Sequence, residues 1–443
     1  MSFSGTIIFR GESGFREVLN DIVWNAMKPE REPAVIVRPQ SAADVADAVK
    51  LAAEKGLQIK ARSGGHSWTA SCVRQDSMLI DLGEINDITV DRESSTAVIG
   101  TGAKVKQVVG TLADNDLFFP AGHCPSVGIG GFLLQGGWGW NSRALGVACT
   151  NVRAVDVVTA DGRLIHANAT ENPEYYWGAR GAGSGYFGIV THFHVSCFTQ
   201  PKCLLHRQEI YPEECGEEIM KWSFGLQEQL PNEVEWFVFC SRPSPTEKAQ
   251  YRVEAISFLS DESTGRQALE IFDSCPVRHK AISSSPTAIT DMATLLAGTD
   301  GLYLEGYRWA GDNAWFDQGS DDLAAAIVEA ANVLPPWPSH LVVYGWPSPL
   351  PFQDSLFSMA GKIYACAISG WNDPKQDSTG RSASMRSISM LEPFAKGMGL
   401  ADEGLLYRDA PVHSIKNAEQ LERIRKKVDP ENRFLSYLTK GGK

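Results

Sequence analysis

The chain has 443 residues, of which 43% are hydrophobic and 21% are charged, and its formal net charge is -12 at pH 7. A chain of this length exceeds what one hydrophobic core usually serves, so we expect two domains. The acidic balance and the lack of Lys or Arg runs argue against a surface for phosphate backbones. Nucleic acid is therefore not an expected partner.

The N-terminal residues lack the basic and apolar regions of a secretory signal, and no apolar run reaches the length of a membrane-spanning helix. The nine cysteines form no CxxC pair and no regular framework, which indicates reduced thiols. We expect a cytoplasmic protein without a membrane partner, and the sequence does not indicate an oligomeric state.

The first 200 residues mix strands and helices. Helix periodicity, a Ser41 cap and a closing Gly56 predict a helix over 41–56, and Asp161-Gly162 predicts the turn of a β-hairpin over 152–167. Alternating or short apolar runs predict strands near 33–40, 57–62, 78–83, 88–102 and 189–198. Further helices are expected over 103–116 and 172–180.

Residues 202–404 have a different pattern, in which strand-like runs alternate with amphipathic helices such as 321–334. This pattern favours a large antiparallel sheet covered by helices on one side. The runs lie at 234–242, 251–260, 302–309, 340–346 and 361–371. A charged helix follows near the C-terminus and is stopped by Pro430.

Three glycine-rich segments stand out at 62–67, 122–140 and 180–188. Glycine lets backbone N–H groups approach an anion and permits a positive φ, so three such loops suit a dinucleotide cofactor. Any one loop could equally be a tight turn. The third segment is preceded by a helix and followed by none, which excludes the nicotinamide-type fingerprint.

Five stretches, 61–68, 121–140, 157–162, 171–191 and 428–434, together resemble the berberine bridge enzyme-like family, a branch of the vanillyl-alcohol oxidase (PCMH-type) flavoproteins. The resemblance is close over about 30–200 and the last twenty residues. It implies an α+β fold: an FAD-binding domain of two α/β subdomains over 1–201 and 405–443, and a substrate domain over 202–404.

In that family a loop histidine is bonded to the flavin 8α-methyl group, and in doubly linked members a cysteine is bonded to flavin C6. The matching residues are His66 and Cys124, so the resemblance implies a doubly linked FAD; a buried thiol and an unlinked histidine are the alternatives. Imidazole and thiolate are nucleophiles suited to such bonds. Two electron-withdrawing attachments would raise the reduction potential of the flavin.

The resemblance also implies further cofactor contacts. The first loop would bind the pyrophosphate through its backbone, the second would line the ring and ribityl chain, and the third and the tail would meet the adenosine side. The residues are Arg62, Ser63, Gly64, Gly65 and Ser67; Gly128, Gly130, Gly131, Gly136, Gly137 and Gly139; and Gly188, Ile189 and Asn432.

The residue three after the cysteine controls dioxygen access in this family, and Val there accompanies oxidases. Val127 therefore favours an oxidase that reduces O2 to hydrogen peroxide while oxidising a small cyclic alcohol, amine or alkaloid-like metabolite. An oligosaccharide oxidase, a dehydrogenase with another electron acceptor, and a flavin-bearing binding protein stay open as alternatives.

Oxidation of a C–OH or C–N donor usually needs a base for the heteroatom proton. The family's tail motif Y-x-N-Y is only partly matched, because Tyr407 is followed by Arg408 and Asp409 with no equivalent Asn. If 302–309 is a strand, Tyr303, Glu305 and Tyr307 share one face and could line a pocket. The alternative interpretation is that these three side chains form a strand face that is exposed to solvent.

Other side chains of the sheet are further candidates. A phenol near Arg308 would have a lowered pKa and could act as the base, and Tyr344 and Tyr364 lie on neighbouring runs. Trp309, Trp346 and Trp371 could pack a planar substrate, although most strand tryptophans are core residues. His192 and His194 alternate on one strand, but no third ligand is apparent, so no metal site is expected.

Overall fold

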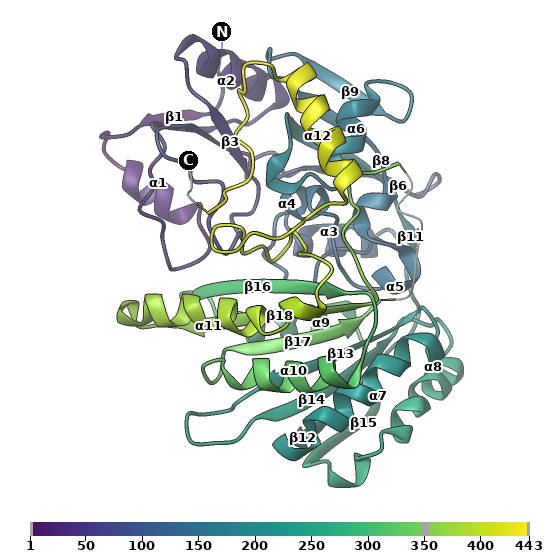
Figure 1. Cartoon of the computed structure of the whole chain (residues 1–443). Helices are drawn as coiled ribbons and strands as arrows, with labels where there is room; N and C mark the ends of the chain where they lie inside the picture. Colours follow the sequence, from purple (N-terminus) through teal and green to yellow (C-terminus); the bar gives the residue numbers. More distant parts are fainter. Residues whose placement is uncertain (1–2, 347–353, 441–443) are drawn as a thin grey trace.

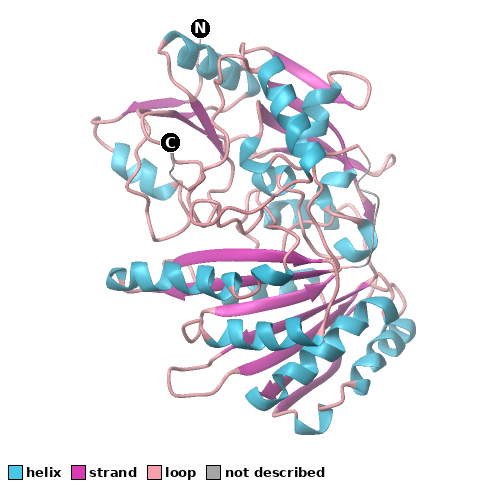
Figure 2. Cartoon of the chain, viewed as in Figure 1, coloured by secondary structure: helices cyan, strands magenta, loops and turns pink. Residues whose placement is uncertain are grey.

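The computed structural model describes residues 3–346 and 354–440. Two smaller sheets form from the N-terminal part of the chain and one large sheet from its middle, and the two parts lie one above the other in Figure 1. The secondary structure is mixed throughout, as Figure 2 shows. In this part of the chain no helix has both the length and the apolar character needed to cross a bilayer.

The first sheet has the order β1-β2-β4-β3, with β1 (Thr6–Phe9), β2 (Val35–Arg38), β3 (Ile59–Arg62) and β4 (Met78–Asp81). Strands β2 and β3 run parallel to β4, so their connection needs a crossover, which α2 (Ala42–Glu54) supplies. The backbone N–H of Asp44 donates to the Ser41 hydroxyl and begins this helix, as predicted. Helix α1 (Phe15–Asp21) lies between β1 and β2 in the chain.

The second sheet is antiparallel, with the order β5-β6-β10-β8-β9. Its strands β8 and β9 form the predicted hairpin, and Gly162 has the positive φ that its turn requires (76°). The strands are β5 (Ile88–Asp91), β6 (Thr96–Gly100), β8 (Val152–Val158), β9 (Leu164–Asn168) and β10 (Ile189–Ser196). The other elements of this part are α3 (Val105–Ala113), α4 (Ile129–Leu134), α5 (Ser142–Leu145), α6 (Pro173–Ala179) and the short pair β7 (Leu117–Phe118) and β11 (Phe198–Thr199).

The large sheet has seven antiparallel strands in the order β15-β12-β14-β13-β17-β18-β16. These are β12 (Leu204–Pro212), β13 (Val234–Ser241), β14 (Gln250–Ser257), β15 (Ser283–Thr290), β16 (Arg308–Phe316), β17 (His340–Gly345) and β18 (Ile363–Trp371). The helices in this part are α7 (Gly216–Gln229), α8 (Glu262–Leu269), α9 (Met292–Leu302), α10 (Asp321–Asn332) and α11 (Asp377–Ser389).

Side-chain alternation along the strands gives this sheet two different faces. Trp236 and Val238 of β13 join the hydrophobic core formed with α7, α10 and α11, whereas Phe237 between them belongs to a separate aromatic cluster on the other face. One face is thus covered by helices, as the sequence predicts, and the other faces the N-terminal part (Figure 1).

The C-terminal segment returns to the first part of the chain. Helix α12 (Ile415–Val428) ends two residues before Pro430, and the Arg425 guanidinium donates to the carbonyl of Gly185 at 2.7 Å. Phe434 then forms a bridge beside Ile59 of β3. Figure 1 shows this yellow segment lying over the N-terminal elements.

The predicted strand over 302–309 is wrong for its first six residues. Helix α9 continues to Leu302, and Gly306 adopts a positive φ of 82°, so the chain turns before β16 begins at Arg308. A glycine in the left-handed region interrupts extended backbone, which the local alternation of polar and apolar residues does not reveal.

Candidate functional site

A deep cavity lies where the first two glycine loops meet the start of β10 and the large sheet. Most of the predicted cofactor-binding residues line it, from all three glycine segments. They are Arg62, Ser63, Gly64, Gly65, His66, Ser67, Cys124, Val127, Gly128, Gly130, Gly131, Gly188 and Ile189. Residues remote in sequence are therefore brought to one site.

The first two loops touch through their backbones at Gly64 and Gly128. A Cβ on Gly64 would lie 2.3 Å from the backbone N of Gly128, and a Cβ on Gly128 would lie 2.4 Å from the Ser63 hydroxyl. Any other residue at either position would force the two loops apart. Gly65 is equally constrained, because its φ is 73° and a Cβ would meet the carbonyl oxygen of Ile22.

Arg62 holds the first loop in place. Its guanidinium donates to Asp81 at 2.7 Å, to the carbonyl of Ile22 at 3.0 Å and to the carbonyl of Gly64 at 3.3 Å. The side chain is thus already engaged with protein groups. Its positive charge still contributes to the potential at a site that would receive a pyrophosphate.

His66 presents a neutral imidazole to the cavity. Burial, together with the positive charges of Lys104 and Arg62, lowers the pKa of His66 to about 3. The ring stacks on Trp24 with centroids 4.7 Å apart. The imidazole therefore keeps a ring lone pair at neutral pH and is held in a fixed orientation, which suits a nucleophile.

Cys124 lines the same cavity, and its Sγ lies 3.5 Å from the Ser126 hydroxyl. Burial raises the pKa of the Cys124 thiol, against the hydrogen bonds from Ser126. The thiol is therefore protonated at neutral pH before any partner approaches. The His66 ring contacts the backbone of the same Ser126, so the two predicted attachment residues belong to one wall of the cavity.

Lys60 is a buried cation of the cavity that the sequence analysis missed. Its ammonium donates to the carbonyl oxygens of Ser184, Leu435 (2.9 Å) and Ser436 (3.1 Å). Burial lowers the pKa of Lys60 to about 7, and the neighbouring Arg74 and Arg425 act in the same direction. No motif marks this lysine, since its partners come from the third glycine segment and the tail.

Four predicted cofactor residues lie outside the cavity lining. Gly136 and Gly137 have positive φ values of 109° and 80° and pack against Phe357 and Phe132, while Gly139 packs on the carbonyl of Ala121. In the structure these glycines allow a turn of the backbone and close packing next to the cavity. Asn432 lies outside as well, and the tail reaches the cavity through Phe434 and Leu435 instead.

A second cavity of about 320 Å³ adjoins the first, in the range usual for small-molecule sites. Its floor is one row of paired residues across four adjacent strands of the large sheet. The row runs from Glu254 (β14) through Phe237 (β13) and Tyr344 (β17) to Tyr364 (β18). With strands about 4.8 Å apart, the two ends of the row lie roughly 14 Å from each other.

The first end of this floor is polar. The Glu254 carboxylate lies 2.9 Å from Nε2 of His206 and 3.7 Å from Nε of Arg252. The Arg252 guanidinium also lies over the Phe239 ring, 4.2 Å from its centroid. Above the floor, Nε2 of His123 and Nε1 of Trp140 are buried without a hydrogen-bond partner among the described residues. Unpaired buried polar atoms are costly, so these two groups indicate a polar ligand.

The other end of the floor holds a buried phenol–carboxylate pair at the junction of the two cavities. The Tyr364 hydroxyl donates to Asp402 at 2.9 Å, and the Trp68 indole donates to the second carboxylate oxygen at 2.9 Å. Burial raises the pKa of the Asp402 carboxyl, against these hydrogen bonds. Both Tyr364 and Asp402 line both cavities, together with Tyr303, Tyr344, His123 and Thr299.

The structure places only one of the four residues predicted as catalytic at this junction. Tyr303, the residue after α9, lines both cavities. Glu305 is exposed, and neither it nor Tyr307 nor Tyr407 lines either cavity. Their predicted positions depended on a strand that ends in a turn and on a tail motif that is only partly present.

The hypothesis of a phenol activated by Arg308 is wrong. Arg308 is paired with Asp377, with two contacts of 2.5 Å, outside the cavities. Burial raises the pKa values of Tyr303, Tyr344 and Tyr364 well above their ordinary value. Trp309, Trp346 and Trp371 are buried core residues that line neither cavity.

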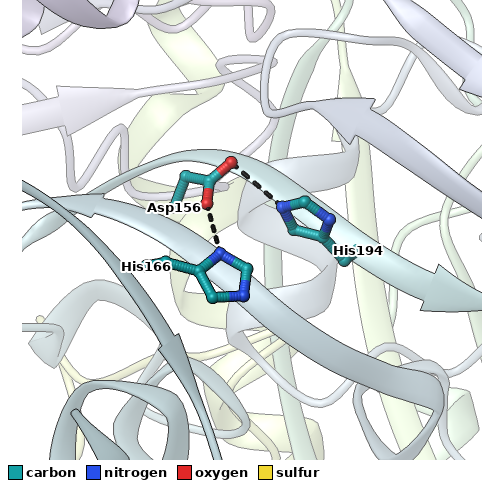
Figure 3. A group of neighbouring side chains, drawn as sticks. All are labelled: Asp156, His166 and His194. Carbon is teal, nitrogen blue, oxygen red and sulfur yellow. Dashed lines mark hydrogen bonds and ion pairs between the residues drawn. The ribbon is translucent and has the colours of Figure 1, made fainter. Parts of the chain in front are cut away.

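His194 has metal-ligand neighbours that the sequence analysis did not find. Asp156 and His166 lie beside it (Figure 3). His192 pairs with Asp87 instead. The expectation that no third ligand lies nearby is therefore wrong. The predicted hairpin contained part of the signal, since its register places residues 156 and 166 opposite each other.

Comparison with known proteins bears on the fold and on the cavity. Residues 33–168 match the FAD binding domain family. The structure resembles 6-hydroxy-D-nicotine oxidase of Arthrobacter nicotinovorans, with a TM-score of 0.85 and 22% identity over 98% of this chain and 97% of the other. It also resembles Physcomitrella patens BBE-like 1, with a TM-score of 0.84 and 21% identity over 98% and 96% of the two chains. The fold is that of the berberine bridge enzyme-like (PCMH-type) flavoproteins.

A closer relative in sequence is the FAD-linked oxidoreductase nodO of Hypoxylon pulicicidum, 30% identical over 419 residues that cover 93% of this chain and 92% of nodO. The chain therefore belongs to the family of FAD-linked oxidoreductases. It is an FAD-dependent oxidoreductase, as the sequence predicts.

The residues of the first cavity fit FAD. The Gly64–Gly128 contact holds two lining loops together, and at Gly131 of the same lining a Cβ would meet nothing within 4 Å, so the main chain there is open to a large group. Lys60 and Arg62 line the cavity and Lys104 lies near His66, and these basic groups suit a pyrophosphate. The aromatic junction with Tyr344 and Tyr364 leads from there to the second cavity, where a small organic donor can bind.

Gly64→Ala should lower the FAD content of the purified protein. The added Cβ meets the backbone of Gly128 at 2.3 Å, so the loops must separate at a cost of about 1–3 kcal/mol. Flavin absorbance per chain measures the effect. Gly110→Ala is the control, because a Cβ there meets nothing within 4 Å. Full flavin content in the Gly64 variant would contradict the role given to this contact.

Proposed function

We propose that the protein is an FAD-dependent oxidase that oxidises a small cyclic alcohol, amine or alkaloid-like metabolite by two electrons and passes them to O2, giving hydrogen peroxide. The proposed FAD-binding domain comprises 1–201 and 405–443, and the proposed substrate domain comprises 202–404. The observation that carries this proposal is the hydrogen-bonded Tyr364–Asp402 pair at the junction of the two cavities.

The pair has the properties of a general base. A carboxylate with a raised pKa accepts a proton more readily than an ordinary one, and Asp402 is within hydrogen-bond reach of the Tyr364 hydroxyl. The O–H or N–H proton of the substrate passes to Asp402, directly or through the Tyr364 hydroxyl. When bound, FAD would supply the acceptor for a hydride from the adjacent carbon, so that an alcohol would leave as a carbonyl compound and an amine as an imine.

The floor of the second cavity supports a cyclic substrate with an apolar body. Phe237 and Tyr344 form its middle, between the reacting end at Tyr364 and the polar end at Glu254, and Phe239 and Val342 of the neighbouring row also line the cavity. A planar or alicyclic ring can pack on these side chains. The unpaired His123 and Trp140 atoms and the Arg252–Glu254–His206 group would then bind a polar substituent remote from the oxidised carbon.

His66 and Cys124 are the proposed attachment points of the FAD. Support comes from the neutral, stacked imidazole and from the position of both side chains on one wall of the cavity. The Cys124 thiol must lose its proton as the bond forms, since burial alone keeps it protonated.

Acid-precipitated protein should stay yellow, and mass analysis should find flavin on the peptides that contain His66 and Cys124. Cys124→Ala should retain the flavin through His66 alone and have a lower reduction potential, because one electron-withdrawing substituent is lost. An uncoloured pellet would contradict covalent attachment, and an unchanged potential would contradict the part given to the thioether.

Asp402→Asn should lower kcat/KM by about 10²–10⁴-fold, because the amide cannot accept the substrate proton. Tyr364→Phe should also lower it, while both variants keep the flavin spectrum. In the parent protein kcat/KM should fall as the pH decreases through the raised pKa of Asp402, where the base becomes protonated.

Steady-state kinetics with a donor that bleaches the flavin under anaerobic conditions measures these effects. Asp409→Asn is the matched control, since Asp409 is an exposed aspartate of the same segment. Equal losses in the Asp409 and Asp402 variants, or a loss in neither, would contradict the assignment of the base.

Reduced protein mixed with air-saturated buffer should reoxidise within seconds. Val127 lines the FAD cavity, so Val127→Leu should slow this step by narrowing the approach of O2 while leaving anaerobic reduction by the donor unchanged. Reoxidation over minutes in the parent protein would instead favour a dehydrogenase with another electron acceptor.

An oligosaccharide is the second candidate substrate, because an aromatic floor beside a polar end also suits a sugar ring. Anaerobic bleaching of the flavin by cyclic secondary alcohols and amines, compared with oligosaccharides, separates the two. Bleaching by oligosaccharides alone would replace the proposed substrate class, and bleaching by neither would favour a flavin-bearing binding protein.

A further inference from the structure

Three side chains with metal-ligating atoms meet on the second sheet, outside both cavities. Asp156 lies on β8, His166 on β9 and His194 on β10, which are adjacent strands in the order β10-β8-β9. Figure 3 shows the Asp156 carboxylate between the two imidazole rings. The proposed oxidation uses none of the three.

The geometry of the group is close. One oxygen of Asp156 lies 2.8 Å from Nδ1 of His166, and the other lies 3.0 Å from Nε2 of His194. One potential ligand atom from each residue lies within 4.8 Å of the others. In a tetrahedral zinc site with bonds of about 2.0 Å, neighbouring ligand atoms are roughly 3.3 Å apart, so small rotations of these side chains suffice.

The sheet itself holds the three residues close together. Asp156 and His166 are direct partners across the β8–β9 hairpin. On the other side, β10 places His192 opposite Asp156 and His194 opposite Ala154, and the His194 side chain reaches the Asp156 carboxylate diagonally. Because hydrogen-bonded strands fix all three backbones, little conformational entropy is lost when the side chains converge on an ion.

The group is open to solvent on its outer side. The side chains of Asp156, His194 and His166 are 28%, 30% and 41% exposed. An ion could therefore enter directly and complete its coordination with water. The carboxylate is held ionised, since the hydrogen bonds from the two histidines outweigh burial and lower the pKa of Asp156.

We propose that Asp156, His166 and His194 form a binding site for a divalent transition-metal ion of the zinc class. Two imidazoles and one carboxylate suit Zn²⁺, Co²⁺, Ni²⁺ or Cu²⁺, whereas Mg²⁺ and Ca²⁺ prefer oxygen ligands. The ion binds the ring nitrogens that now face Asp156, and each neutral imidazole then carries its proton on its other ring nitrogen. The ion would link the three strands β8, β9 and β10 of the second sheet. Strand β10 begins at Ile189, which lines the first cavity.

Because the ion should bind the folded chain and not the unfolded one, it should raise the thermal stability of the protein. The second ring nitrogens of His166 and His194 have no hydrogen-bond partner among the described residues, so no second shell of protein groups supports the ligands. We therefore expect micromolar rather than nanomolar affinity.

The test is calorimetric titration of the EDTA-treated, flavin-containing full chain with ZnCl2 in a non-chelating buffer. We expect one equivalent of zinc to bind at this site and the unfolding midpoint to rise, while MgCl2 and CaCl2 have no such effect. His166→Gln and His194→Gln should each weaken binding by roughly tenfold or more and abolish the rise in midpoint.

His192→Gln is the matched control. His192 lies on the same strand as His194 but pairs with Asp87, so its variant should bind zinc as the parent does. Absence of zinc uptake, or equal binding by the parent and the His166 and His194 variants, would show that the three residues form only a hydrogen-bonded group. Neither result bears on the proposed oxidase activity, which is measured separately through flavin reduction.

Discussion

The contact between the backbones of Gly64 and Gly128 is the constraint on which the cofactor cavity depends. The two loops carry His66 and Cys124, and they meet only because neither glycine has a side chain. Arg62 reinforces the arrangement from behind by binding Asp81 and two loop carbonyls. The loops therefore place a neutral imidazole and a thiol on one wall of the cavity, where we propose that the flavin is attached.

The same first loop connects the cofactor cavity to the substrate cavity. Trp68 follows His66 by two residues and donates to Asp402, which in turn accepts from Tyr364 of the large sheet. Three distant segments therefore share one buried carboxylate. Because burial raises the pKa of that carboxyl, the position at which the two parts of the chain meet holds a group that suits the proton acceptor we propose.

The sequence predicted the elements of the first part well, because their signals are local. The Ser41 cap, the helix periodicity that follows it, and the Asp161-Gly162 turn each act over a few residues, and the structure confirms all three. The strand expected over 302–309 is wrong for residues 302–307, because the local signal there does not distinguish a strand from other structures. Its alternation is compatible with a helix end and a turn, and only the left-handed conformation of Gly306 decides between them.

Site residues divide in a similar way. Those of the glycine loops could be named from motifs, whereas Lys60 and Asp402 carry no motif, since Leu435 and Trp68, which they contact, each lie hundreds of residues away in the chain. For Gly136, Gly137 and Gly139 the cofactor contact stays a prediction, because packing against Phe357 and Ala121 looks the same in sequence as packing against a cofactor.

By itself the amino-acid sequence determined the class of fold and the FAD cofactor, and it marked the glycine loops that we propose bind it, because glycine content and short motifs impose backbone geometry wherever they occur. Tertiary structure alone decided which phenol and which carboxylate share the junction, which row of side chains floors the substrate cavity, and that Asp156, His166 and His194 converge. Strand order and register set these neighbours, and both depend on pairing between segments that no local pattern specifies.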